Sequence, residues 1–144
     1  MTEQEKRTVL ERYQKLDKEI NWNLERLAEW KAFSTRTTAR YSAASVQSGG
    51  AVDRIQLSYE KIEALSEKIN ADIDKLVDLR AEIERFLASL PDPTVRILLW
   101  ERYIGGKNND EIAAILCYCT KQIIRIHARA LQELELPDKL LEYL

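Results

Sequence analysis

The chain has 144 residues, of which 45% are apolar and 32% charged, and its 24 acidic residues nearly balance its 22 basic ones. This composition excludes a disordered chain, and four glycines and three prolines are too few for a sandwich of short strands. The formal charge of −2 excludes a polybasic protein of histone type, although it leaves room for a local basic site.

The first segment, residues 1–33, predicts a long helix. Its apolar residues alternate at steps of three and four, which is the heptad pattern of helices that pack along a seam. Asn23 occupies one position of the series and has two interpretations. It is either a polar residue in the seam, which lowers stability and fixes register, or the point at which the helix turns outward. The seam residues are Val9, Tyr13, Leu16, Ile20, Leu27 and Trp30.

Residues 34–50, STRTTARYSAASVQSGG, are mostly serine, threonine and alanine and end in Gly49-Gly50. Such a composition predicts a flexible loop. Arg36 and Arg40 are its only charges. They either contact phosphates or stay solvated.

Residues 51–90 predict a second long helix with the same alternation, in which Ser66 and Arg80 fill two polar positions. Leu65, Leu79 and Phe86 lie beside this seam and widen the apolar face beyond what a two-helix hairpin needs. We therefore expect a third partner, either the C-terminal part or a second subunit. The predicted seam contains Val52, Ile55, Tyr59, Ile62, Ile69, Ile73, Leu76, Ile83, Leu87 and Leu90.

Pro91-Asp92-Pro93 ends the second helix, because proline cannot donate to the helical ladder and restricts the residue before it. No strand-like alternation occurs along the chain. The sequence therefore predicts an all-α protein, with a long, coiled-coil-like antiparallel hairpin over 1–90 and a second domain over 91–144.

The second domain begins with a short predicted helix over 94–103, followed by Gly105-Gly106. Asn108 then starts a helix of about two turns, with Glu111 placed for a capping box. Cys117-Tyr118-Cys119 makes a tight turn, and Cys119 or Thr120 caps a longer helix. A short helix, a tight turn and a longer helix are the plan of a helix-turn-helix.

The longer helix separates an apolar face from a basic one. Ile123, Ile126, Ala130 and Leu134 share the predicted core face. The opposite face carries cations at steps of four, and no acid occurs from 120 to 132. DNA recognition needs cations for phosphates and Arg, Lys or Gln for base edges, so this face predicts DNA contact, with a solvated basic surface as the alternative. The polar side chains of this face are Lys121, Gln122, Arg125, Arg129 and Gln132.

The segment PDPTVRILLWERYIGGKNNDEIAAILCYCTKQIIRIHARALQELE resembles region 4 of sigma-70-type transcription factors. The matching pieces are LLWERY, the Gly-Gly turn, DEIAAIL and IIRIHARALQEL. The whole chain is similar to a family of small sigma-like regulators encoded by phages and prophages. The resemblance implies a transcriptional regulator, with phage late genes as candidate targets and RNA polymerase core as a second partner.

Carried over by position, the resemblance places base-reading residues at Thr120, Lys121 and Arg125 and phosphate-contacting residues at Gln122 and Ile124. The chain departs from the family pattern at Cys119, where Ser or Thr usually caps, at Cys117, a common glycine position, and at Ile124, usually basic or polar. The acid-balanced 1–90 hairpin does not resemble a promoter-melting region, which favours an accessory sigma-like factor.

We therefore expect a sequence-specific regulator that binds double-stranded DNA, with Arg129 supporting phosphate contact. The alternative is a coiled-coil adaptor that binds only proteins. No phosphate loop and no nucleophile–base pair occurs, so we expect neither an enzyme nor a cofactor. Cys117, Cys119 and His127 supply at most three metal ligands, and His127 faces the apolar side, so we expect a packing histidine and no metal.

The charged N-terminal stretch lacks an apolar signal core, and no run of eighteen apolar residues occurs, so the sequence predicts a cytoplasmic protein without a membrane partner. The wide face of the second helix predicts a homodimer. After Leu136-Pro137, the tail DKLLEYL carries three leucines and is expected to dock on the core or on a second subunit.

Overall fold

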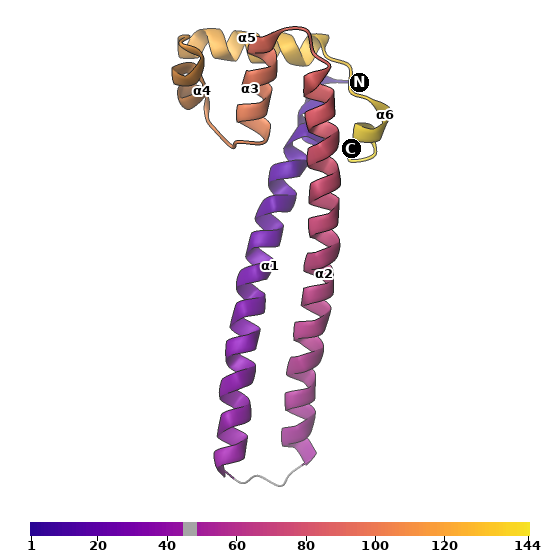
Figure 1. Ribbon diagram of the computed structural model, residues 1–144, viewed down its shortest axis with the longest axis vertical. Coiled ribbons are helices and arrows are strands. Elements are labelled where there is room, and N and C mark those ends of the chain that lie inside the picture. Colours follow the sequence, from indigo (N-terminus) through magenta and orange to yellow (C-terminus); the bar gives the residue numbers. More distant parts are fainter. Residues whose placement is uncertain (45–48) are drawn as a thin grey trace. The chain divides into compact units, whose positions relative to one another are not determined.

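The computed structural model describes residues 1–44 and 49–144, and within these ranges every regular element is a helix (Figure 1). This confirms the all-α class. The two long helices run antiparallel and pack against each other. The helices are α1 (Glu3–Ala44), α2 (Gly49–Ala88), α3 (Pro93–Tyr103), α4 (Asn109–Leu116), α5 (Thr120–Glu133) and α6 (Asp138–Leu141).

The chain forms two compact units. The first, the terminal unit, contains residues 1–17 and 76–144, and the second, the hairpin unit, contains residues 18–75. Both α1 and α2 contribute to both units. Pro91, where the sequence places a domain boundary, lies between α2 and α3 inside the terminal unit.

Helix α1 continues through much of the segment that the sequence predicts as a loop. It extends to Ala44 and α2 begins at Gly49, so the predicted loop is wrong for 34–44 and for 49–50, while 45–48 lie outside the described residues. Two threonine hydroxyls donate to carbonyls four residues earlier, Thr35 to Lys31 at 3.0 Å and Thr38 to Ser34 at 2.8 Å. Such bonds satisfy the hydroxyl groups within a helix, so the Ser/Thr-rich composition of this segment does not end α1.

The buried side of α2 is rotated from the predicted seam. Tyr59 and Ile73 are exposed, whereas Ser58 and Asp72, one position earlier, are buried. Leu79 and Phe86 are likewise buried and form part of the packed face, while Arg80 is exposed. Two heptad series run through this sequence one residue apart at alternate positions. The observed one buries Leu79 and Phe86 in the terminal unit and leaves Arg80 exposed, and in the hairpin unit it buries Ser58 and Asp72.

In the hairpin unit the seam is unusually polar. Ile20 and Ile69 are its buried apolar side chains, and they share the interior with Asn23, Ser34 and Ser58. Asn23 lies mid-helix and is 3% exposed, so it is the polar seam residue, and α1 does not turn outward there. The Lys68 ammonium lies 3.4 Å from Glu19 across the seam and 3.0 Å from Asp72 one turn along its own helix.

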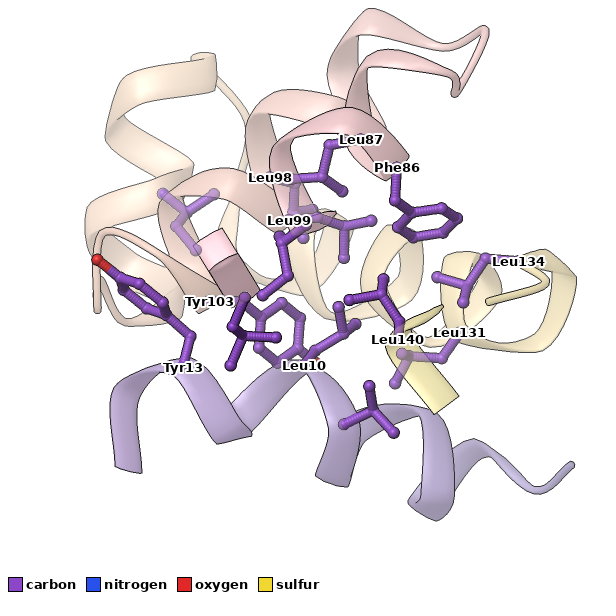
Figure 2. Packing of buried hydrophobic residues seen from close by; sticks show 14 of the residues in the cluster. Leu10, Tyr13, Phe86, Leu87, Leu98, Leu99, Tyr103, Leu131, Leu134 and Leu140 are labelled. Atoms are coloured by element: carbon purple, nitrogen blue, oxygen red, sulfur yellow. The ribbon is translucent and has the colours of Figure 1, made fainter. Parts of the chain in front are cut away.

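In the terminal unit the ends of α1 and α2 pack with α3, α4 and α5 around one hydrophobic core, seen from close by in Figure 2. Leu79 and Phe86 are buried there, so the C-terminal helices of the same chain cover this part of the wide face of α2 that predicted a dimer, whereas Leu65 belongs to the hairpin unit and is partly buried. Self-association stays a prediction. Leu140 of α6 is fully buried in this core, which agrees with the expected docking of the tail, while Leu144 is half exposed.

Candidate nucleic-acid interface

Helices α4 and α5 are joined by the turn Cys117–Cys119. Asn108 caps α4 through the predicted capping box: its side chain accepts from the Glu111 N–H at 2.9 Å, and Glu111 accepts from the Asn108 N–H at 3.3 Å. The helix ends at Cys117, which has φ 60° and ψ 38°. This left-handed conformation reverses the chain and suits glycine best.

Cys119, rather than Thr120, is the N-cap residue of α5. The Gln122 side-chain oxygen accepts from the Cys119 N–H at 3.4 Å. The Thr120 hydroxyl donates to Asp110 Oδ1 at 2.8 Å and so joins the start of α5 to the start of α4. Two of the predicted DNA-contacting residues therefore have a structural role at the beginning of α5.

The buried face of α5 comprises Ile123, His127, Ala130 and Leu131. Ile126, predicted as core, is only partly buried, and Leu131 takes the more interior position. His127 is 5% exposed, and its Nε2 lies 2.7 Å from the hydroxyl of the equally buried Tyr103 on α3. The histidine is a packing residue with a polar partner, as the sequence predicts.

Burial, helped by the positive charges of Arg102 and Arg7, lowers the pKa of His127 from its ordinary value to about 4. The ring is therefore neutral at physiological pH. Burial also raises the pKa of Tyr103, so its hydroxyl remains protonated. This neutral pair fixes α5 to α3 without placing a charge in the core.

The exposed face of α5 carries Lys121, Arg125 and Arg129, one per turn. Within the described residues, neither Lys121 nor Arg125 forms a salt bridge. Arg129 Nε, by contrast, lies 3.0 Å from the carboxylate of Glu133, the first acid after the predicted basic stretch. Both of these side chains are largely exposed, so the pair is weak and a phosphate could compete for the guanidinium.

Ile124 is also exposed on α5, although it has no polar group with which to contact a phosphate. The resemblance placed a phosphate contact at this position. An apolar side chain there can contact a thymine methyl group or a sugar, and it cannot replace an ion pair.

Lys6 is the residue of this region that sequence reasoning missed. Its ammonium, from α1, donates to the carbonyl of Leu131 at 2.9 Å and lies 3.4 Å from that of Gln132. The last turn of α5 has no basic residue of its own, and Lys6, which is 8% exposed, supplies the cation that the C-terminal end of a helix dipole favours. Lys6 and Leu131 are 125 positions apart in the sequence, so no local sequence pattern indicates their contact.

The three residues that could supply metal ligands do not converge. Cys117 and Cys119 are exposed free thiols, while His127 is buried against Tyr103. In the part of the chain that the structure describes, no group of three or more histidine, cysteine or acidic side chains is arranged to hold a metal ion.

Comparison of the chain with protein-family models, curated proteins and solved structures finds no match. Over residues 1–44 and 49–144, no helix is both long and apolar enough to cross a membrane.

Proposed function

We propose that α4 and α5 form a helix-turn-helix and that α5 is a recognition helix that docks in the major groove of double-stranded DNA. On this proposal the protein is a sequence-specific, accessory sigma-like regulator of transcription of phage or prophage type. The observation that carries the proposal is the row of Lys121, Arg125 and Arg129 on the solvent face of a helix whose opposite face is buried.

The support is electrostatic and geometric. Lys121 lies in the first turn of α5 and Arg125 one turn later, and both are exposed without a carboxylate partner among the described residues. The N-terminal part of a recognition helix enters the groove, and a bidentate contact with guanine discriminates by about 1–3 kcal/mol. Arg129 lies a further turn along, where a side chain reaches the phosphate backbone.

The anchoring of α5 also fits this role, because a reading helix must be held rigidly. A hydrogen bond of Thr120 joins the beginning of α5 to α4, and one between His127 and Tyr103 joins its middle to α3. Lys6 of α1 donates to a carbonyl at the end of α5. None of these three contacts occupies Lys121 or Arg125. RNA polymerase core remains a proposed second partner, which is supported by the sigma-like resemblance.

A second candidate function is that of a protein-binding adaptor. It is favoured by apolar side chains exposed on α4, the turn and α5, namely Ile115, Tyr118 and Ile124. Their exposed fractions are 39–51%, so they leave an apolar surface beside the basic row. An adaptor would use these residues and leave the cations in solvent.

The test is to select duplexes from a random DNA pool with the full chain and to measure affinity by fluorescence anisotropy at two salt concentrations. DNA binding through α5 predicts affinity that falls with salt and weakens when Lys121 and Arg125 are both changed to glutamine. Lys15→Gln with Lys18→Gln, which neutralises two exposed cations of α1, is the charge-matched control. No salt-dependent binding, or equal loss in the control, would refute the proposal and favour the adaptor.

A further inference from the structure

A pocket of about 440 Å³ lies in the hairpin unit, between the last turns of α1 and the first turns of α2. This volume is within the range of small-molecule sites. We call it the hairpin pocket. Its walls combine three aromatic rings, one leucine and two guanidinium groups, from Trp30, Phe33, Tyr41, Leu57, Arg40 and Arg54.

The aromatic side chains form a corner in the pocket. The rings of Trp30 and Phe33 meet edge to face, with centroids 5.8 Å apart and planes at 88°. Phe33 is 46% exposed, so a large part of its surface is available to a ligand. The base of the pocket includes Ser58, which is almost completely buried. This corner offers π surface to a planar ring.

The charge of the pocket is positive. No carboxylate lines it, and neither arginine forms a salt bridge within the described residues. Arg54 Nη1 donates to the Tyr41 hydroxyl at 3.3 Å, which links α2 to α1 beside the pocket. The sequence from 30 to 57 has four bases and one acid, in a chain whose net charge is negative. An anionic occupant is therefore favoured.

We propose that the hairpin pocket binds a nucleotide unit, with the base against Trp30 and Phe33 and the phosphate between Arg40 and Arg54. Guanidinium groups bind phosphate bidentately, and an aromatic platform beside cations is how single strands are bound without sequence reading. The same unit could come from a free nucleotide or from single-stranded nucleic acid. This site is separate from α5 and does not depend on the proposed reading of duplex DNA.

The test uses the full chain with two probes, thymidine monophosphate and a fluorescein-labelled oligothymidylate of about twelve nucleotides. Binding is followed by anisotropy for the labelled probe and by quenching of tryptophan fluorescence for both. Binding of both probes identifies the free nucleotide as sufficient, and binding of the oligonucleotide alone identifies the single strand as the source. Either result supports the site, provided that the variants below respond as expected.

We expect Arg40→Gln with Arg54→Gln to weaken oligonucleotide binding at least about tenfold and to lower the salt slope by about 0.7, which is the contribution of the one phosphate that the two arginines share. Phe33→Ala should weaken it about tenfold through loss of stacking. Lys31→Gln with Lys61→Gln, which neutralises one exposed cation on each of the two helices outside the pocket, is the matched control and should change little. Circular dichroism establishes that each variant is folded.

Four outcomes would overturn the proposal. The first is no binding of either probe by the folded protein. The second is an equal effect of the Lys31/Lys61 control and of the Arg40/Arg54 pair. The third is equally tight binding of an oligoglutamate of the same charge, which would identify an acidic peptide as the occupant. The fourth is loss of oligonucleotide binding on changing Lys121 and Arg125 instead, which would assign this binding to α5 and leave the duplex-binding proposal standing.

Discussion

Replacing His127 by glutamine should remove a pH dependence of stability that the buried Tyr103–His127 pair creates. The folded protein holds His127 at a pKa of about 4, against 6.5 for the ordinary side chain. As the pH falls below 6.5, His127 therefore becomes protonated in the unfolded chain while it stays neutral in the folded chain. Stability due to this group is fully present above pH 6.5 and is lost as the pH falls from 6.5 towards 4.

The magnitude follows from the shift. One pKa unit corresponds to about 1.4 kcal/mol, so two and a half units give an upper value of about 3 kcal/mol. The side chain is 5% exposed, so solvent screens this effect little, although the neighbouring Arg102 and Arg7 can move away and reduce it. We expect a loss of about 1–3 kcal/mol in the unfolding free energy of the wild-type chain between pH 6.5 and pH 4.

The assay is urea unfolding followed by circular dichroism at several pH values, for the wild-type chain and for His127→Gln. Carboxylates titrate in both proteins, so the difference between the two curves isolates the histidine. Glutamine keeps a polar group near the Tyr103 hydroxyl and has no charge to acquire. Parallel curves across this range, or a His127 pKa near 6.5 by NMR, would refute the burial argument.

Three further predictions concern the terminal unit. Lys6→Met should lower the unfolding free energy by about 1–3 kcal/mol, because two carbonyls at the end of α5 lose a charged donor; Lys15→Met is the exposed control, and equal losses would contradict the capping role. Cys117→Gly should raise the melting temperature by a few degrees, because glycine adopts the left-handed conformation without the steric cost of about 1 kcal/mol that a side chain adds there. An unchanged or lower melting temperature would contradict this. Leu140→Ala should lower the unfolding free energy measured by chemical denaturation by about 2–5 kcal/mol, and Leu144→Ala, at a half-exposed position, should lower it much less. Small losses of similar size for both variants would mean that the tail is not part of the core.

The sequence predicted the features of this fold that are local. The all-α class, the capping box of Asn108 and the turn at Cys117–Cys119 follow from periodicity and from short-range hydrogen bonding, and each is present. The burial of His127 also followed from its place on the apolar face of α5. These features need no knowledge of distant parts of the chain.

The features that escaped prediction depend on tertiary packing. The choice between Leu79 and Arg80 as the inward residue of α2 could not be made from α2 alone, because both series keep heptad spacing. The continuation of α1 beyond 33 depends on packing of small side chains such as Ser34 in the seam, which composition alone does not reveal. The contact of Lys6 with α5 joins the two ends of the sequence, so only the folded chain shows it.

The same distinction applies to the candidate interface. The exposure of Lys121, Arg125 and Arg129 follows from helical spacing. That the Thr120 hydroxyl bonds Asp110, and that Glu133 pairs with Arg129, depends on side-chain geometry. Among the predicted polar contacts, Arg125 and Lys121 therefore become the most direct candidates for reading bases.

The measurement that tests the central claim most directly is the ratio of affinities for a selected duplex and for random duplex DNA, with Arg125→Ala compared with Arg129→Ala. Reading of bases by the early part of α5 predicts that Arg125→Ala lowers this ratio about tenfold or more, which is the loss of one bidentate base contact. Arg129→Ala should weaken both affinities alike and reduce the salt slope by about one. If folded Arg125→Ala leaves the ratio unchanged, α5 does not read DNA through this face, and the account is contradicted.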